Sequence, residues 1–169
     1  PEVVIDGPAP PAPLIVGDDY PTAACTDAVG VATCTVEPVG PIPAEAAGTT
    51  VTTTATGTDP AGNSTTVTRD YEVVERGATT ATATLVPASP VIEEGGSVDL
   101  EITVDGPANA TIDWGDGMTE STVVDADAPT TVPHTYDVAG VYVVKVFVTS
   151  NVDFIELTTE YVVVFDPGG

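Results

Sequence analysis

The segment Ile-Asp-Trp-Gly-Asp-Gly at residues 112–117 restricts the fold of this chain more than any other. Asp116-Gly117 predicts a tight hairpin turn, because Gly accepts the positive φ that such a turn needs and Asp can bond its own backbone. Trp114 lies in the apolar run before the turn, where we expect it to fill the middle of a small core. The segment therefore predicts two β-strands joined by a turn.

A second segment, His-Thr-Tyr at residues 134–136, follows a polar excursion and leads into another strand. Tyr136 precedes Gly140, and a Tyr at such a corner can donate a hydrogen bond back to the backbone. His134 is the only His of the chain, and alone it makes neither a catalytic triad nor a transition-metal site. We interpret both segments as scaffold, with structural roles for Trp114, Asp116, Gly117, His134 and Tyr136.

Composition places the whole chain in the all-β class. Val and Thr are abundant and suit a pleated sheet, while 16 Gly and 16 Pro punctuate it. No run of apolar residues at helical spacing is long enough to argue for a helix. Turn signals recur every ~8–12 residues, as in β-sandwiches. The 169 residues suffice for two small domains, and we expect tandem antiparallel sandwiches at residues 1–76 and 77–169.

Alternating segments predict the individual strands. In the first unit they are residues 3–5, 14–16, 23–25, 31–34, 50–56 and 65–74. Segments 23–25 and 31–34 are expected to form a hairpin. In the second unit the strands are residues 79–86, 97–104, 110–114, 119–124, 141–149 and 154–165. The linker at residues 75–77 is very short, which predicts a stiff pair of modules.

The second unit resembles the polycystic-kidney-disease-type (PKD) domain, which is an Ig-like β-sandwich. Trp-Gly-Asp-Gly at 114–117, His-Thr-Tyr at 134–136, Gly140 and Tyr-Val-Val at 142–144 carry a resemblance that covers roughly residues 78–166. It departs at residues 112–114, where Ile-Asp-Trp stands for the Trp-Asp-Phe frequent in the family. The resemblance implies an extracellular spacer or interaction module, and it implies no activity.

The first unit resembles the Ig-like repeats of bacterial secreted and surface proteins, notably those of actinobacteria. Cys-Thr-Asp at 25–27, Gly-Val-Ala-Thr-Cys-Thr at 30–35 and Thr-Asp-Pro-Ala-Gly-Asn at 58–63 carry this resemblance, which covers almost all of residues 1–75. It implies an Ig-like sandwich in which the two cysteines pair. Gly57 is an extra residue relative to the family pattern and predicts a β-bulge.

Cys25 and Cys34 lie nine positions apart across a Gly-containing segment. An even count of cysteines in an acidic chain rich in Thr and Gly favours a disulfide, which a hairpin would permit. So short a loop contributes only about 2–3 kcal/mol in the entropy model. The alternative is a metal-binding thiol pair, but without a nearby His or further Cys it makes a poor zinc set. A disulfide implies an oxidising compartment, so we predict a secreted, extracellular or cell-surface location.

The formal net charge of −23 arises from 26 carboxylates and only three cations. Nucleic acids and anionic membranes both require a basic face, so the charge argues against these partners. Our main interpretation is resistance to self-association, and a high-salt habitat or shielding by divalent cations are alternatives. No apolar run approaches the ~20 residues of a membrane span, so no membrane insertion is expected. Without a signal peptide or initiator Met, the chain is expected to be a mature or excised piece.

Loop carboxylates are the only ligand candidates, and calcium is the ion that suits them. Calcium takes about six to eight oxygen ligands. The candidate groups are Asp18 and Asp19 with Asp59, and Glu93 with Glu94 beside the domain boundary. None has the spacing of an EF-hand, and solvated loop residues are the alternative. We expect no other cofactor.

No catalytic pattern accompanies these features. The serines lack a Gly-x-Ser-x-Gly elbow, and paired acids would need a cleft to hydrolyse glycosides. We therefore predict a non-enzymatic extracellular structural module: a stalk, a spacer, or the subunit of a filament or surface layer. Its partners would be neighbouring domains or identical subunits. Residues 1–5 and 161–165 are apolar enough to add to a neighbour's sheet edge during self-assembly.

The alternative function is a carbohydrate- or matrix-binding accessory module of a secreted hydrolase, with a polysaccharide or matrix protein as partner. Such a module would carry a row of exposed aromatic side chains on one sheet face. In the sequence, Tyr20, Tyr161 and Phe165 are too scattered to indicate one.

Overall fold

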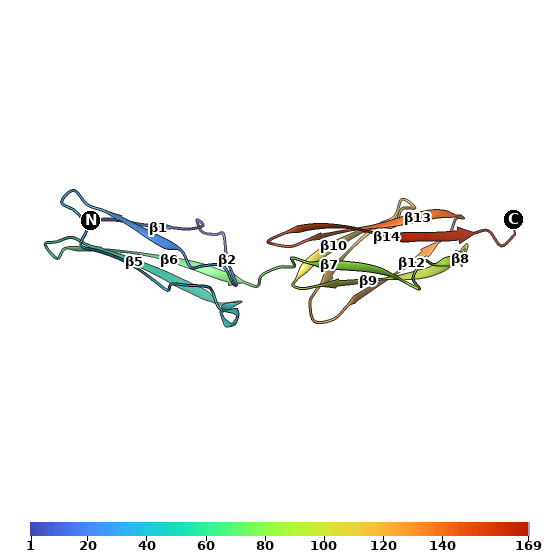
Figure 1. The fold of residues 1–169 in the computed structure, drawn as a ribbon, viewed down its shortest axis with the longest axis horizontal. Coiled ribbons are helices and arrows are strands. Elements are labelled where there is room, and N and C mark those ends of the chain that lie inside the picture. Colours follow the sequence, from blue (N-terminus) through green and yellow to red (C-terminus); the bar gives the residue numbers. More distant parts are fainter. Residues whose placement is uncertain (169) are drawn as a thin grey trace. The chain divides into compact units, whose positions relative to one another are not determined.

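In this computed structural model the chain divides into two β units, Pro1–Glu75 and Arg76–Gly169 (Figure 1). The structure describes residues 1–168, and Gly169, at the end of the predicted second unit, lies outside them. Within the described residues the only helical element is the short 3-10 turn Ala44–Ala46. The all-β prediction is therefore confirmed.

The first unit packs a two-stranded sheet against a four-stranded sheet. The small sheet pairs β1 (Glu2–Asp6) with β3 (Thr22–Thr26). The larger sheet has the order β2-β6-β5-β4, with bounds Leu14–Ile15, Ser64–Val74, Thr50–Thr58 and Thr33–Glu37. Alternate residues of each strand face inward, and they form two small clusters: Val3, Ile5 and Ala55, and Leu14, Ile42, Tyr71 and Val73.

The predicted hairpin between residues 23–25 and 31–34 is wrong. β3 pairs with β1, whereas β4 pairs with β5. A connection of six residues, 27–32, is longer than the two-residue turns that most readily join paired strands. It crosses from one sheet to the other, so Cys25 and Cys34 lie on opposite layers of the sandwich.

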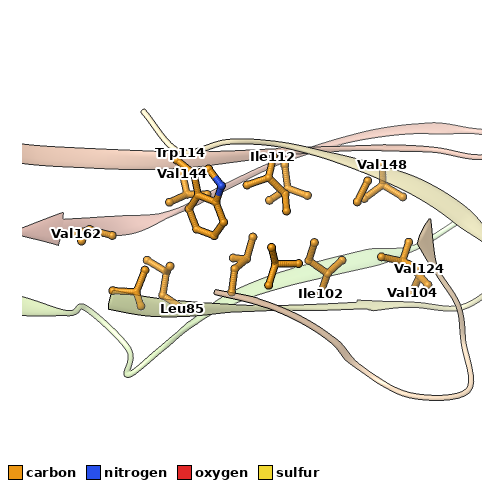
Figure 2. Close-up of a cluster of buried hydrophobic side chains, with 14 of the residues drawn as sticks. Leu85, Ile102, Val104, Ile112, Trp114, Val124, Val144, Val148 and Val162 are labelled. Carbon is orange, nitrogen blue, oxygen red and sulfur yellow. The ribbon is translucent and has the colours of Figure 1, made fainter. Parts of the chain in front are cut away.

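The second unit packs a five-stranded sheet, in the order β11-β10-β13-β14-β8, against a three-stranded sheet, in the order β12-β9-β7. The strands of the first sheet are Thr119–Val124, Ala108–Asp113, Gly140–Thr149, Phe154–Phe165 and Val91–Glu93, and those of the second are Thr130–Tyr136, Gly96–Val104 and Ala81–Val86. Side chains from both inner faces meet in one core, where Ile102 and Val104 face Ile112, Val144 and Val148 (Figure 2).

Two strands of the second unit, β8 and β12, are absent from the sequence prediction. β8 has only three residues, too few to show an alternating pattern. β12 contains Pro133, which cannot donate a ladder hydrogen bond. The structure accommodates it because β12 is an edge strand, next to β9 alone.

A β-bulge divides β14 into two halves with opposite phase. Lys145 of β13 pairs with Thr158, but Val143 pairs with Tyr161, so β14 carries one extra residue between these positions. A one-residue insertion exchanges the two faces of a strand. Val162 and Val164 consequently point into the core, while Tyr161 and its alternate neighbours point outward.

The segments proposed as self-assembly donors belong to the sandwiches themselves. Glu2–Asp6 is paired with β3. Val163, Val164 and Phe165 pair with β8, and the first two of these also pair with β13. Either segment would have to leave its own sheet to join a neighbour, and self-assembly through these segments stays a prediction.

Candidate functional site

The two predicted scaffold segments meet at one corner of the second unit. The side chains of Trp114, His134, Tyr136 and Tyr142 form what we call the aromatic corner. Trp114 and His134 are stacked, with ring centroids 4.4 Å apart and planes inclined by 8°. Tyr136 meets His134 edge-on at 4.7 Å and stacks on Tyr142 at 4.6 Å. Trp114 and Tyr136 are fully buried, so the corner closes one end of the core.

Hydrogen bonds hold the turn over this corner. The Tyr136 hydroxyl donates to the Trp114 carbonyl oxygen at 3.0 Å. Asp116 Oδ1 accepts from the Met118 N–H, and Asp116 Oδ2 lies 2.8 Å from His134 Nε2. Gly117 has φ of 95°, a conformation that Gly adopts readily. These contacts join β10 and β11 to β12 through side chains.

The electrostatics of the corner favour fixed protonation states. Burial raises the pKa of the Asp116 carboxyl, but hydrogen bonds from His134 and the Met118 N–H lower it by more, so the pKa lies below its ordinary value. Burial also raises the pKa of Tyr136 well above its ordinary range, and the Asp116 charge adds to this. Asp116 therefore stays an acceptor and Tyr136 a donor across the physiological pH range.

A hollow of about 440 Å³ lies beside the aromatic corner, lined by residues that include Asp116, His134 and Thr135. A hydrolytic relay would need a nucleophile hydrogen-bonded to His134. The Thr135 hydroxyl instead pairs with the Ser97 hydroxyl at 2.7 Å. His134 Nε2 is used by Asp116, and the ring is enclosed by two aromatic side chains. The geometry is that of a structural brace.

The predicted calcium ligands of the first unit lie at opposite ends of β6. Asp18 and Asp19 follow β2, which pairs with the end of β6 at Val73 and Val74. Asp59 belongs to the turn that opens β6, near Ser64. Ten residues of strand rise by about 33 Å, so the structure does not bring these carboxylates together and the predicted grouping is wrong.

Asp59 is occupied by its own turn. Its Oδ1 accepts from the N–H groups of Ala61 and Asn63 at 2.8 and 2.9 Å, and its Oδ2 accepts from Asn63 Nδ2 at 2.7 Å. These hydrogen bonds lower the pKa of Asp59, with the Asn63 side chain contributing most. Asp59 thus holds the β5–β6 hairpin.

Glu93 and Glu94 lie far from the domain boundary. Glu93 pairs with Phe165 at the end of β14, whereas Gly77 donates to Asn151 just before β14 begins. The prediction that Glu93 and Glu94 lie beside the domain boundary is therefore wrong, because the whole length of β14 separates them from it. Glu94 Oε1 instead accepts from the Ala139 N–H at 2.7 Å. Within residues 1–168, no three His, Cys, Asp or Glu side chains gather where they could hold a metal ion.

The disulfide between Cys25 and Cys34 joins the two sheets of the first unit, with Cα atoms 5.9 Å apart. Gly57 lies directly beneath it. A Cβ at this position would come within 3.1 Å of Cys25 Sγ and 2.9 Å of Val3 Cγ2. Gly57 pairs in register with both neighbouring strands, so the predicted bulge is wrong. The glycine makes room for the disulfide.

An exposed apolar surface covers part of the outer face of the five-stranded sheet. We call it the outer strip, and it consists of Val91, Val141, Phe154, Tyr161, Val163 and Phe165. Tyr161 is 63% exposed, Phe154 59% and Phe165 43%. Val141, Val163 and Val91 are paired in one row across three strands. Sequence reasoning missed the strip because the bulge in β14, which sets the phase of Tyr161 and Phe165, has no signal in the sequence.

No family model and no curated protein matches this sequence. Among solved structures, the D1–D4 ectodomain fragment of ICAM-5 is similar over 98% of this chain and 54% of its own length, with 17% identity and a TM-score of 0.59. This chain has a tandem Ig-like fold. The PKD domain of human SorCS2, a VPS10 domain-containing receptor, matches over 54% of this chain and 77% of its own (19% identity, TM-score 0.47).

The D00–D0 domain of intimin is also similar, over 97% of this chain and 98% of its own length, with 15% identity and a TM-score of 0.40. At these identities the likeness concerns the fold. None of the helical turns in residues 1–168 is long and apolar enough to cross a membrane.

Proposed function

We propose that this chain is a load-bearing spacer of an extracellular surface protein, built from a bacterial Ig-like unit and a PKD-type unit. The tandem Ig-like fold, the disulfide and the net charge of −23 support this role. A disulfide persists in oxidising compartments, and the charge opposes aggregation of β-rich surfaces. The only His of the chain, His134, is held by structural contacts in the aromatic corner. This supports a non-enzymatic role for the chain.

The observation that carries the proposal is a parallel strand pair in each unit. In the first unit, β2 pairs in parallel with the last strand, β6, through Leu14 and Val73. In the second unit, β8 pairs in parallel with the last strand, β14, through Val91 and Val163. Tension on the two ends of a unit slides such strands past each other. The hydrogen bonds between them then bear the load together, whereas a hairpin pulled from its open end loses them one by one.

Stretching single molecules tests this role. Repeats of the chain should unfold in two discrete steps per copy under tension, since each unit has its own core. Reducing the disulfide should lengthen the extension of the first unit by about 25 Å, because the chain between the cysteines, a sequence separation of nine, is released and the intact bridge already spans 5.9 Å. A chain that extends without discrete steps would contradict the load-bearing role.

A variant pair isolates the parallel strands of the second unit. The Glu94 N–H donates to the Phe165 carbonyl at 3.0 Å, next to β8. Glu94→Pro removes this bond and the Glu94 side chain, while Glu94→Ala removes the side chain alone. We expect Glu94→Pro to unfold at a lower force than Glu94→Ala. Equal forces would show that the parallel pair does not bear the load.

The outer strip favours a second candidate function, namely binding to another macromolecule. Exposed apolar patches on soluble proteins frequently mark interaction sites. A matrix protein and a polysaccharide are the two partner classes expected from the sequence.

A further inference from the structure

We propose that the outer strip is the docking surface for a protein partner that presents an apolar segment bordered by Lys and Arg side chains. This inference rests on the second candidate function, binding, and is independent of load bearing. The strip is defined above by six exposed residues on β8, β13 and β14.

The strip holds apolar residues that the core lacks. The chain has three Phe, Phe147, Phe154 and Phe165, and none of them belongs to the buried core of the second unit. All three lie on the outer face of β13 and β14, where Phe147 stacks with Phe154 at 6.2 Å. Burying a Phe side chain contributes roughly 1.5–3 kcal/mol, so leaving all three outside forgoes a large share of the available stabilisation.

The same sheet shows what an ordinary solvated face looks like in this protein. The outward residues of β10 are Asn109, Thr111 and Asp113, in register with β13. A sheet with one face in water normally carries polar residues there. The apolar outer residues gather on β13, β14 and β8, whereas β10 has none and β11 has a single one, Val123.

The strip has two parts on β14, Phe154 at one end and Tyr161 to Phe165 at the other, with the outward-facing Glu156 and Thr158 between them. Phe154 to Phe165 extends over about 36 Å of strand. The bulge after Thr158 rotates the second half of β14, so that Tyr161, Val163 and Phe165 share the outer face with Phe154. Val141 and Val91 widen the strip on both sides of Val163.

Area and charge argue against a second copy of this chain as the occupant. Two long strands of about 36 Å and the three-residue β8, spaced about 4.8 Å apart, give on the order of 400 Å², which is less than the roughly 800 Å² per partner of stable interfaces. Two chains with net charge −23 also repel each other. The strip suits a positively charged partner whose interface is smaller than that of a stable dimer, or which makes the same small contact several times.

The chemistry of the strip distinguishes a protein from a polysaccharide. The valine row offers no hydrogen bonds, and sugar hydroxyls placed against it would lose those that they make with water. Acidic side chains lie among and beside the strip residues: Glu93 pairs with Phe165, and Glu156 follows Phe154 on the outer face of β14. One cation, Lys145, shares this face on β13. Cationic side chains around an apolar segment would complement the acidic ones.

A binding titration with synthetic probes tests the proposal. One labelled peptide alternates Lys and Val, and its counterpart alternates Glu and Val. We expect the Lys peptide to bind the full chain, with an affinity that falls as salt is raised, and the Glu peptide not to bind. The double variant Tyr161→Ser/Phe165→Ser should weaken binding about tenfold or more. Val123→Ser, an exposed valine on the same sheet face at β11, should change it less than about twofold.

Several outcomes would overturn the proposal. They are no binding of the Lys peptide, equal binding of both peptides, and equal loss of affinity in the double variant and in Val123→Ser. Salt-independent binding of a neutral polysaccharide that the double variant abolishes would assign the strip to a glycan. A doubled mass in light scattering that the double variant abolishes would assign it to a second copy. Thermal melts of each variant, followed by Trp114 emission, verify that the second unit remains folded.

Discussion

The Tyr136→Phe substitution tests whether the aromatic corner holds the second unit together. The ring remains and continues to stack on Tyr142, so the change removes little more than one hydroxyl group. That hydroxyl donates to the Trp114 carbonyl oxygen at 3.0 Å in a fully buried position. The variant therefore measures one buried hydrogen bond with little change in packing.

The expected cost is about 2 kcal/mol. A buried polar group that loses its partner costs roughly 1–3 kcal/mol, and water cannot reach the Trp114 carbonyl to replace the lost donor. For a domain of this size each kcal/mol lowers Tm by about 4–8 °C. We therefore expect Tm of the second unit to fall by about 8–16 °C.

Trp114 provides the assay, because it is the only Trp of the chain and lies in the second unit. Its emission during urea or thermal unfolding reports this unit without interference from the first. Circular dichroism followed in parallel records both units. The cost should appear as a lower midpoint with an unchanged m-value.

Tyr142→Phe is the matched control. Its hydroxyl donates to the Val138 carbonyl at 2.8 Å, and Val138 is exposed, so water can replace this donor. We expect a cost below about 1 kcal/mol. If Tyr136→Phe costs no more than Tyr142→Phe, the hydrogen bond across the corner does not stabilise the unit.

Three further predictions concern other contacts. The double variant Cys25→Ala/Cys34→Ala should destabilise the first unit by about 2–3 kcal/mol and leave the Trp114 transition unchanged; a shift in that transition would contradict the separate cores. Gly57→Ala should cost about 1–3 kcal/mol in the disulfide-bonded chain, and less in the double Cys variant, as measured by circular dichroism; an equal cost in both would exclude the disulfide as the cause. Hydrogen bonds from the side chain of Thr79, then from the backbone, hold the pKa of Asp105 well below its ordinary 3.8. The ionised Asp105 carboxylate therefore stabilises the second unit above pH 3.8, and this contribution is lost as the pH falls below 3.8. In Asp105→Asn, the free energy of unfolding measured by denaturant titration should depend less on pH in the acid range.

Sequence patterns predicted the class of fold because it depends on local chemistry. Alternation of Val and Thr with Gly- and Pro-containing turns placed β9, β11 and β14 within a residue or two of their observed bounds. The Asp116-Gly117 turn and the corner at Tyr136 have steric and hydrogen-bonding requirements that few residue types meet. Each of these signals lies within a few residues of the structure that it specifies.

The same patterns did not predict which strands pair with each other. Segments 23–25 and 31–34 look like two halves of a hairpin, but β3 prefers β1 and β4 prefers β5. The acidic pairs predicted as ligands were separated for the same reason, because their positions depend on which strand ends meet. Each choice is decided by the packing of both sheets at once, and no local pattern records it.

The sequence by itself determined that the chain is all-β. It also predicted a turn at Asp116-Gly117 and a corner at Tyr136, and its charge predicts that anionic partners are disfavoured. Only the tertiary structure decided that the disulfide joins two sheets over Gly57 and that Tyr161 and Phe165 face solvent. The physical reason is that a strand has two faces, and one extra residue in β14 exchanges them. Pairing with β13 and β8 selects the phase that buries Val162 and Val164, and the outer strip is the consequence.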